Sequence, residues 1–500
     1  MDYSKLQNGS DIRGVALEGI EGQPINLTEQ ASRDIGRGFA LWLMEKTGKK
    51  QLRVAVGRDS RLSGAALSGW ICDEMAKQGL LVTDFGMAST PAMFMATVTE
   101  GYAFDGTVMI TASHLPFNRN GFKFFTAQGG LEKGDIKQIL TYAGGDAQTG
   151  LQAAEVSEGS FMDAYAAILA DKIRAATGEE KPLEGFRIVV DAGNGAGGFY
   201  AEKVLKPLGA DTEGSRYLDP DGSFPNHIPN PEDKEAMKSI TEAVKETGAD
   251  LGIIFDTDVD RAGAVLSDGS ELNRNRIIAM LAAILLREHP GTTIVTDSIT
   301  STGLAKFIEA KGGVHHRFKR GYRNVINESI RLNALGQDSQ LAIETSGHGA
   351  LKENYFLDDG AYLVTKLLIE LARGKKEGYT LESLIAELEE PAESVEFRMN
   401  ILVEDFKTYG QKVIDELTVY AQGQTGWSLA PSNYEGVRVN LDEAHGNGWF
   451  LLRLSLHDPL LPLNIESNSA GGAKKIASEL ATFIGGYAQL DAQKLMDYVK

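Results

Sequence analysis

The chain has 500 residues, of which 42% are hydrophobic and 24% charged, a composition typical of a soluble globular protein with an ample core. Lys and Arg number 50 and Asp and Glu number 69, which gives a formal net charge of −19. Nucleic-acid binders and proteins that dock on anionic membranes depend on clustered cations, so this balance argues against both classes. An anionic ligand would need a local positive site in this negative protein.

The single cysteine, Cys72, excludes an intramolecular disulfide and a cysteine-based metal site. The first residues lack the basic and apolar regions of a secretory signal, and no apolar run approaches the roughly 18 residues of a membrane span. We therefore expect a cytoplasmic protein, or one of an organelle stroma if a transit peptide has been removed.

Short β-branched runs alternate with helix-period segments through most of the chain, whose length suggests three or four domains at about 150 residues each. A first series has strands at 53–57, 81–85 and 107–111 and a helix at 63–79. A second has strands at 186–192 and 251–256 and a helix near 198–208. A third has strands at 292–298 and 341–345 and helices from 301 and at 361–374. This alternation predicts parallel sheets with helices on both faces.

The last part of the chain has a different pattern. Strands are expected at 394–401, 436–441, 449–455 and 461–467, with helices at 404–421 and 472–485. This order predicts an α+β domain with an antiparallel sheet. Polar, glycine-rich stretches near 144–158, 267–272 and 375–393 are the expected boundaries between domains.

The segment Asp-Thr-Asp-Val-Asp-Arg at 256–261 follows a predicted buried strand. In extended chain Asp256, Asp258 and Asp260 would point the same way and converge on one point. Three carboxylates repel one another unless a cation lies between them, and oxygen ligands favour a hard ion such as Mg²⁺. The alternative is a solvated acidic turn. An EF-hand is disfavoured because Arg261 stands where that motif has glycine.

Residues 111–125 connect two predicted strands, so Ser113 lies on a loop where a hydroxyl can be exposed. His114 is adjacent in sequence and poorly placed to be the base of a triad. Ser113 could be an ordinary loop serine, but a serine opposite three aspartates and Mg²⁺ could carry a phosphoryl group. Lys123 would then carry a proton or pair with phosphate, unless it is an exposed strand lysine.

Two further stretches place alternating polar side chains at the ends of predicted strands. Glu344, Ser346 and His348 could hold sugar hydroxyls, and a structural histidine is equally compatible with the pattern. Arg453 and Ser455 could hold a phosphate. The alternative there is a strand with one exposed arginine.

The glycine-rich stretch 193–198 lies between a predicted strand and a predicted helix, and it matches the dinucleotide-binding pattern G-x-G-x-x-G. Asp211 and Glu213 lie near the distance at which that motif has an acidic residue. A plain glycine-rich turn explains the segment without a ligand, and we favour that interpretation.

Taken in this order, these stretches resemble the α-D-phosphohexomutase family, the phosphoglucomutase/phosphomannomutase group. The resemblance begins with Asp11-Ile-Arg13-Gly14 and Val56-Gly-Arg58-Asp-Ser-Arg61-Leu-Ser-Gly64 and continues nearly to the end of the chain. It implies an α/β fold of three related α/β domains with mixed, mainly parallel sheets and a C-terminal α+β domain, around a central cleft. The expected domains are 1–152, 153–268, 269–392 and 393–500.

The resemblance also implies a role for each candidate residue. Ser113 would be a phosphoserine, with Mg²⁺ held by a phosphoryl oxygen and by Asp256, Asp258 and Asp260. The supporting groups around the transfer would be Arg13, His114, Lys123 and Arg261. The sugar-binding residues would be Glu344, Ser346 and His348, with Arg317 and Lys319 from a looser match. The phosphate-binding residues would be Arg453, Ser455 and His457.

The implied reaction is a reversible shift of phosphate between O1 and O6 of a hexose, glucose or mannose. The phosphoserine gives its group to the sugar phosphate, and the resulting hexose 1,6-bisphosphate turns end for end and returns the other phosphate. The implied cofactors are Mg²⁺ and hexose 1,6-bisphosphate as activator. The expected partner is a small phosphosugar, with no nucleic acid and no membrane, and the chain would be a monomer or dimer.

The chain departs from the family pattern in two places. Leu115 stands where the catalytic loop usually has asparagine, and Leu456, His457 and Asp458 replace the glycine, threonine and glutamate of the usual phosphate clamp. Leucine resists the close backbone approach that glycine permits, and histidine binds phosphate best when protonated. We therefore expect a weaker clamp or an altered substrate. The alternatives are a phosphoglucosamine mutase and a phosphosugar-binding protein of low activity.

Overall fold

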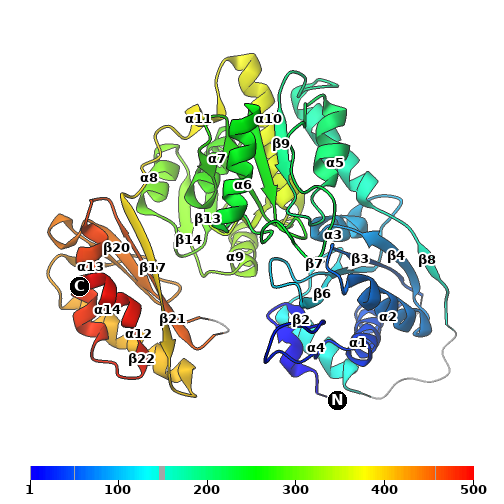
Figure 1. Cartoon of the computed structure of the whole chain (residues 1–500), viewed down its shortest axis with the longest axis horizontal. Coiled ribbons are helices and arrows are strands. Elements are labelled where there is room, and N and C mark those ends of the chain that lie inside the picture. The colour runs from blue at the N-terminus through cyan, green and yellow to red at the C-terminus, as the bar shows by residue number, and fades with distance from the viewer. Residues whose placement is uncertain (1, 50, 146–152, 456–457) are drawn as a thin grey trace. The chain divides into compact units, whose positions relative to one another are not determined.

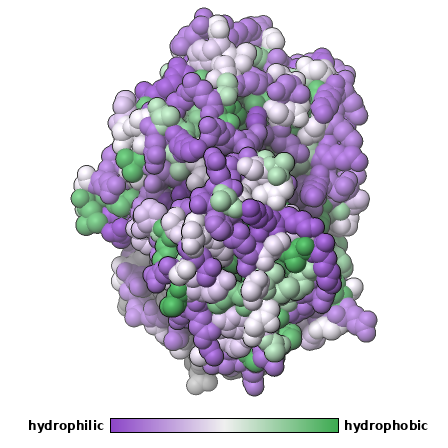
Figure 2. All heavy atoms as spheres, turned by 90° about the vertical axis from the view of Figure 1, so that its left-hand side faces the viewer, coloured by the Kyte–Doolittle hydropathy of each residue, from purple (hydrophilic) through white to green (hydrophobic). Residues whose placement is uncertain are grey.

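The structure, a computed structural model, describes residues 2–49, 51–145, 153–455 and 458–500. The chain forms two compact units, which are described separately: Met1–Ile277 with Ser346–Ser383, and Ile278–Thr345 with Leu384–Lys500. Figure 1 labels the helices and strands. Hydrophilic residues predominate on the face drawn in Figure 2. Within the described ranges, no helix combines the length and the apolar character that crossing a membrane requires.

The first unit begins with an eight-stranded mixed sheet in the order β1-β2-β6-β5-β3-β4-β8, with β7 beside β6. Its strands are β1 (Gln7–Asn8), β2 (Asp11–Val15), β3 (Arg53–Arg58), β4 (Leu81–Met87), β5 (Gly106–Ile110), β6 (Arg119–Thr126), β7 (Gly129–Gly130) and β8 (Val156–Glu158). The predicted strands β3, β4 and β5 pair in parallel, whereas β6 runs antiparallel to β5. The helices of this segment are η1 (Ser4–Leu6), α1 (Glu29–Thr47), α2 (Gly64–Lys77), α3 (Thr90–Val98) and α4 (Lys133–Ala143).

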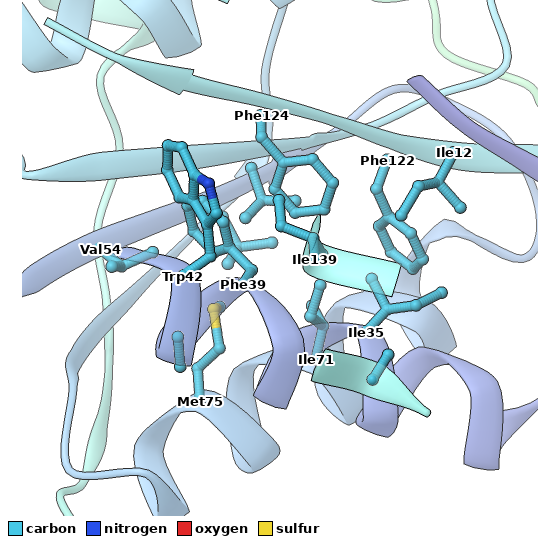
Figure 3. Packing of buried hydrophobic residues seen from close by; sticks show 14 of the residues in the cluster. Ile12, Ile35, Phe39, Trp42, Val54, Ile71, Met75, Phe122, Phe124 and Ile139 are labelled. Carbon is cyan, nitrogen blue, oxygen red and sulfur yellow. The ribbon is translucent and has the colours of Figure 1, made fainter. Parts of the chain in front are cut away.

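The alternation of side chains along β6 separates the two faces of this sheet. Phe122 and Phe124 join the core formed with α1, α2 and α4, where the rings of Phe39 and Phe124 lie 4.7 Å apart (Figure 3). Phe125 points to the other face, where it packs against a phenylalanine of α3. Lys123 lies between the two core residues in sequence, so its side chain also leaves on the face of α3.

The second sheet of the first unit has the order β12-β11-β10-β9. Its strands are β9 (Ile188–Asp191), β10 (Leu251–Phe255), β11 (Ala262–Leu266) and β12 (Glu271–Leu272). β9 and β10 pair in parallel as predicted, and β11, which was not predicted, returns antiparallel to β10. The helix predicted near 198–208 is a π-helical turn, η2 (Tyr200–Leu205), followed by a 3₁₀ turn, η3 (Lys206–Leu208). Helices α5 (Met162–Thr177) and α6 (Lys234–Thr247) complete this part.

The segment that rejoins the first unit contains β16 (Gly349–Leu351), η4 (Lys352–Asn354) and α10 (Gly360–Glu377), followed by the short α11 (Leu381–Leu384). Helix α10 packs against α5 and β11. Its N-terminus is capped by the side chain of Asp359, which accepts a hydrogen bond from the amide of Tyr362. This cap fixes the chain that leads from β16 into the helix.

The second unit contains two sheets. After α7 (Arg274–Glu288), strand β13 (Thr293–Thr296) pairs in parallel with β14 (Val314–Arg317) and β15 (Ser339–Ile343), joined by α8 (Thr302–Ala310) and α9 (Tyr322–Ala334). The C-terminal sheet has the order β18-β19-β20-β21-β17-β22 and is antiparallel throughout, as predicted. Its strands are β17 (Glu393–Ile401), β18 (Trp427–Leu429), β19 (Val437–Leu441), β20 (Gly448–Leu452), β21 (Leu460–Ser467) and β22 (Leu490–Asp491). Its helices are α12 (Phe406–Gln422), η5 (Glu443–His445), α13 (Gly472–Ile484) and α14 (Gln493–Val499).

Candidate active site

Three aspartates directly after β10 form the centre of the candidate site. Asp256, Asp258 and Asp260 are each at most 1% exposed, and one oxygen from each lies within 4.8 Å of the others. The segment is a turn rather than extended chain, because Val259 has φ of +69°, a left-handed conformation that β-branched residues rarely adopt. The carboxylates do converge, but the turn produces the convergence and strand alternation does not.

The glycine-rich stretch 193–198 packs against this turn. The amide of Ala196 donates to the carbonyl of Thr257 at 2.8 Å, and a Cβ built on Gly195 would lie only 2.7 Å from the same oxygen. Only glycine permits this close approach. Asp211, the acidic residue of the dinucleotide pattern, pairs instead with Arg187. The stretch is therefore a packing surface for the aspartate turn, in keeping with the plain-turn interpretation.

Ser113 lies at the start of the loop that follows β5. Its φ is +49°, and its amide donates to the hydroxyl of Thr111 at 2.9 Å, which holds the backbone in this conformation. Its Oγ donates to Asp256 Oδ2 at 2.9 Å, and the residue is 9% exposed. The serine hydroxyl is thus directed at the aspartate turn.

Arg261 and His114 contact this hydroxyl, and Arg13 binds the backbone that leads to it. Arg261 is 1% exposed; its Nε donates to Asp256 at 3.1 Å and its Nη2 to Ser113 Oγ at 3.1 Å. The same Nη2 donates to His114 Nδ1 at 2.6 Å, so that nitrogen accepts and carries no proton. Arg13 on β2 donates to the carbonyl of Thr111 at 2.7 Å, in the chain that leads to the serine.

Lys123 is buried at the aspartate turn, which excludes its interpretation as an exposed strand lysine. Its Nζ donates to Asp258 Oδ2 at 3.0 Å and also to Asp260. Burial alone would lower the pKa of Lys123, but the charges of the two aspartates outweigh it and hold this pKa well above its ordinary value. The Thr90 hydroxyl, at the start of α3, donates to the same Asp258 oxygen.

The aspartates do not share the surrounding positive charge equally. Burial, together with the charges of Asp260 and Asp258, raises the pKa of Asp256 well above its ordinary value. Burial would raise the pKa of Asp260 as well, but the charges of Lys123, His348 and Arg261 outweigh it and lower this pKa. Burial therefore disfavours the ionised form of Asp256, whereas the cations beside Asp260 favour its ionised form.

The aspartate turn fits a bound cation. Among the described residues, Asp258 Oδ1 and Asp260 Oδ1 are buried and have no hydrogen-bond partner. A buried carboxylate oxygen without a partner is costly unless a cation satisfies it. With only oxygen donors, the trio suits a hard metal ion.

The predicted sugar-binding residues Glu344, Ser346 and His348 follow β15. In the first unit, His348 Nδ1 donates to Asp358 Oδ2 at 2.6 Å and lies 3.8 Å from Asp260 Oδ1. Burial would lower the pKa of His348, but the charges of Asp358 and Asp260 raise it to about 9. Ser346 is buried in the same unit. In the second unit, Glu344 accepts a hydrogen bond from the amide of Gly321 at 2.6 Å.

The predicted phosphate-binding residues belong to the second unit. Strand β20 ends at Leu452, so Arg453 and Ser455 lie beyond it and not on the strand predicted for 449–455. Arg453 is 7% exposed, and its Nη1 lies 3.8 Å from Glu435 Oε1. The Ser455 hydroxyl accepts from the amide of Asp458 at 3.2 Å. His457, with Leu456, lies outside the described residues.

The two cations predicted to contact sugar differ in their surroundings. Arg317 Nη2 donates to the carbonyl of Ser301 at 2.7 Å and its Nε donates to the hydroxyl of Thr300 at 3.1 Å. Lys319 is exposed. The guanidinium of Arg317 therefore ties down the start of α8.

Two residues of the site were missed in the sequence. Asp358 pairs with His348, and Thr90 donates to Asp258. Thr90 is the first residue of α3, after the cap Ser89, and Asp358 precedes Asp359, the cap of α10. No sequence signal distinguishes them from ordinary polar residues at a helix start, because only the fold brings their partners to them.

Known proteins resemble this chain over most of its length. Models of the α/β/α domains I, II and III of phosphoglucomutase/phosphomannomutase match residues 4–145, 163–269 and 273–391. A phosphomannomutase/phosphoglucomutase of Pseudomonas putida is 32% identical over 450 residues, covering 89% of this chain and 90% of that protein. A phosphoglucosamine mutase of Corynebacterium jeikeium is 28% identical over 96% of this chain and 99% of its own.

A solved structure extends the likeness to three dimensions. The crystal structure of a phosphoglucomutase/phosphomannomutase family protein from Burkholderia thailandensis has a TM-score of 0.78 and 28% identity, covering 98% of this chain and 100% of that one. The domain matches cover well over half of the chain, and the sequence and structural likenesses run almost end to end. The chain belongs to the phosphoglucomutase/phosphomannomutase family of the α-D-phosphohexomutases and is a mutase enzyme.

Proposed function

We propose that this enzyme interconverts hexose 1-phosphate and hexose 6-phosphate, with glucose or mannose as the sugar, through a phosphate carried on Ser113. The observation that carries the proposal is the position of the Ser113 hydroxyl, 2.9 Å from Asp256 within a buried cluster of three aspartates. A hydroxyl beside a cation-binding cluster suits a group that gains and loses negative charge during phosphoryl transfer.

The proposed transfer forms one phosphorus–oxygen bond and breaks another. A sugar hydroxyl attacks the phosphorus of phosphorylated Ser113 and the bond from phosphorus to the serine oxygen breaks. The proton of the sugar hydroxyl ends on that serine oxygen, so Ser113 is left as a free hydroxyl. The product is a hexose 1,6-bisphosphate, which returns its other phosphate to the serine after turning end for end. Arg261, which donates to the serine hydroxyl, is placed to hold a phosphoryl oxygen there.

The metal ligands that we propose are Asp256, Asp258, Asp260 and a phosphoryl oxygen on Ser113, and the ion that we propose is Mg²⁺. When bound, a divalent ion would neutralise charge on the phosphoryl group. Lys123 supplies a fixed cation to Asp258 and Asp260. Arg13 contacts the serine loop, residues 111–118, and His114 belongs to it. Both are proposed as supporting polar groups around the transfer.

We propose that separate groups of residues bind the sugar and the remote phosphate of the substrate, as the family resemblance implies. Glu344, Ser346 and His348 would bind sugar hydroxyls, with Arg317 and Lys319 nearby, and Arg453, Ser455 and His457 would bind the remote phosphate. The domains proposed to contribute these groups are 1–152, 153–268, 269–392 and 393–500. Hexose 1,6-bisphosphate is the proposed activator, because it would phosphorylate Ser113.

A coupled assay of glucose, mannose and glucosamine 1-phosphates, with Mg²⁺ and a trace of hexose 1,6-bisphosphate, tests the substrate. Turnover of the glucose or mannose ester well above that of the glucosamine ester supports the proposal. Preference for the glucosamine ester would instead identify a phosphoglucosamine mutase. Tight binding of all three esters without turnover would identify a phosphosugar-binding protein of low activity.

A further inference from the structure

The guanidinium of Arg61 contacts the serine loop, and the Arg61 side chain is fully buried. Its Nη1 donates to the carbonyl oxygens of Pro116 at 2.9 Å and Arg119 at 3.0 Å. Its Nη2 donates to the carbonyl oxygens of Ser113 at 2.5 Å and Leu115 at 2.6 Å. One side chain therefore binds the carbonyl groups of three residues of the loop between β5 and β6 and that of the first residue of β6.

This arrangement gives the loop a shape that its own backbone would not hold. Carbonyl dipoles that point to a common centre repel one another, and buried carbonyls without donors are costly. The guanidinium has five donors in a rigid fork and can satisfy several acceptors at once. Ser113 is also in the left-handed region at φ of +49°, a conformation that non-glycine residues keep only when their surroundings impose it.

Arg61 is itself held in place by two parts of the first unit. Asp59, fully buried, lies 3.5 Å from its Nε and accepts a hydrogen bond from its amide at 2.9 Å. The ring of Phe224 lies 5.3 Å from the guanidinium carbon. Gly222 approaches the same turn so closely that a Cβ there would lie 2.3 Å from the carbonyl oxygen of Ser60. The chain that follows β9 thus reaches the arginine that holds the serine loop.

We propose that Arg61 is a positioning residue for phosphoryl transfer, which keeps the backbone of Ser113 in the orientation that directs its hydroxyl at Asp256. This inference rests on the proposed function, because it assigns Arg61 a part in aiming the phosphate carrier. Arg61 binds only main-chain carbonyls of the loop, so it acts on catalysis through Ser113. A displacement of about 1 Å of a reacting group can reduce a rate by 10²-fold. Loss of the hydrogen bonds from Arg61 to the loop therefore affects the catalytic step more than substrate binding.

The test compares Arg61→Lys with a matched control, Arg37→Lys. Arg37 is also buried, pairs with a nearby aspartate, Asp34, and donates to two main-chain carbonyls, those of Ala143 and Gly145. Arg37 belongs to α1, and the two carbonyls lie at the end of α4, away from the serine loop. Lysine keeps the charge at each position but loses the planar fork, so a general effect on folding appears in both variants.

For each variant we would measure Tm, kcat, KM for the preferred hexose 1-phosphate, and the fraction of enzyme that carries phosphate by intact mass. We expect kcat of Arg61→Lys to fall by about 10- to 100-fold with KM within about threefold of wild type. Arg37→Lys should keep kcat within about threefold even if its Tm falls equally. Equal kcat values in the two variants, or a raised KM with unchanged kcat for Arg61→Lys, would overturn the inference.

A second variant keeps the test decisive if Arg61→Lys is unfolded at the assay temperature. Asp59→Asn keeps the shape of the residue that holds Arg61 but removes its charge, and we expect the same fall in kcat without a change in KM. Wild-type kcat in a folded Asp59→Asn would then overturn the inference. A wild-type enzyme without turnover of any hexose phosphate would refute the proposed function, whereas an active wild type with an unaffected Arg61→Lys refutes the role of Arg61 alone.

Discussion

Ser113 Oγ and Asp256 Oδ2 lie 2.9 Å apart although 143 positions separate the two residues in the chain. Ser113 follows β5 of the first sheet and Asp256 follows β10 of the second, so each stands beyond the carboxyl end of a strand that pairs in parallel with a neighbour. Such strand ends are where open α/β sheets place their ligands. The pair therefore joins the candidate phosphate carrier to the candidate metal site.

Replacement of the buried Lys123 at the aspartate turn should destabilise the enzyme and increase the stabilisation that Mg²⁺ gives it. Lys123→Met leaves Asp258 and Asp260 without their ion partner, and loss of one partner of a buried pair costs about 3–5 kcal/mol. Added Mg²⁺ should restore part of the lost stability by binding the two aspartates that the lysine no longer neutralises. We expect Mg²⁺ to raise the Tm of the variant more than that of wild type.

The matched control for this experiment is Lys46→Met. Lys46 pairs with Asp135 at 3.3 Å, with half of the lysine side chain exposed, so its loss should cost no more than about 1 kcal/mol. Its Tm response to Mg²⁺ should equal that of wild type. Equal responses to Mg²⁺ in Lys123→Met and wild type would contradict the assignment of the aspartates as metal ligands.

Gly195 should be required for activity, because it allows the aspartate turn to approach the glycine-rich stretch. In Gly195→Ala the new Cβ would lie 2.7 Å from the carbonyl oxygen and 2.8 Å from the Cα of Thr257, so the turn must shift. Overpacking of this kind costs about 1–3 kcal/mol, and the displaced aspartates should also lower kcat. Thermal unfolding and steady-state kinetics measure the two effects.

Gly69→Ala is the matched control for this substitution. Gly69 lies within α2, and a Cβ there would meet no atom within 4 Å. Alanine in a helix interior is favoured over glycine by about 0.5–1 kcal/mol, so this variant should be slightly more stable with unchanged kcat. A Gly195→Ala enzyme that behaves like Gly69→Ala would show that the close approach has no role.

The strands and the aspartate cluster could be predicted because both depend on local pattern. Apolar runs located β3, β9, β10, β13 and β21, and the spacing of the three aspartates indicated that they would converge. The turn at Val259 could not be predicted, since a valine with positive φ contradicts its local preference and is imposed by packing. The same holds for η2, whose helix was predicted but whose π-helical geometry was not.

Burial and long-range pairing limited the prediction of the site. Alternation along β6 indicates which face Lys123 takes, but only the fold brings Asp258 and Asp260 to it. The alternation of Glu344 and His348 predicts a common sugar-binding role. Their hydrogen-bond partners, the amide of Gly321 and the carboxylate of Asp358, could not be predicted from that pattern. Periodicity describes a strand and says nothing of the turn that follows it.

Stability near the candidate site should depend on pH through His227. Burial alone would lower the pKa of His227, but the hydrogen bond to Asp191 and the charge of that residue raise it above its ordinary value. The stabilisation is fully present below the unfolded-state pKa of about 6.5 and is lost as pH rises through the higher folded-state pKa. His227→Asn should therefore lower Tm more at about pH 5.5 than at about pH 9.

Differential scanning calorimetry of wild type and His227→Asn at both pH values measures this difference in Tm. His289→Asn is a suitable control, because His289 is exposed at the end of α7 and its substitution should change Tm little at either pH. If His227→Asn lowered Tm equally at the two pH values, the charge of the histidine would not contribute to stability.

The altered phosphate clamp should weaken substrate binding. The double variant Leu456→Gly with His457→Thr introduces the residues usual in the family, which permit close backbone approach and supply a hydroxyl. We expect a lower KM for the hexose phosphate with little change in kcat, because the clamp holds the phosphate that does not react. An unchanged or raised KM would count against a weakened clamp and favour an altered substrate.

The most direct test of the central claim is the intact mass of the purified enzyme after incubation with hexose 1,6-bisphosphate and Mg²⁺. A covalent phosphoryl group adds about 80 Da, and this addition should be present in wild type and absent from Ser113→Ala. Ser113→Ala should also lack mutase activity. An 80 Da addition that persists in Ser113→Ala, or an active wild type that never carries it, would contradict the account.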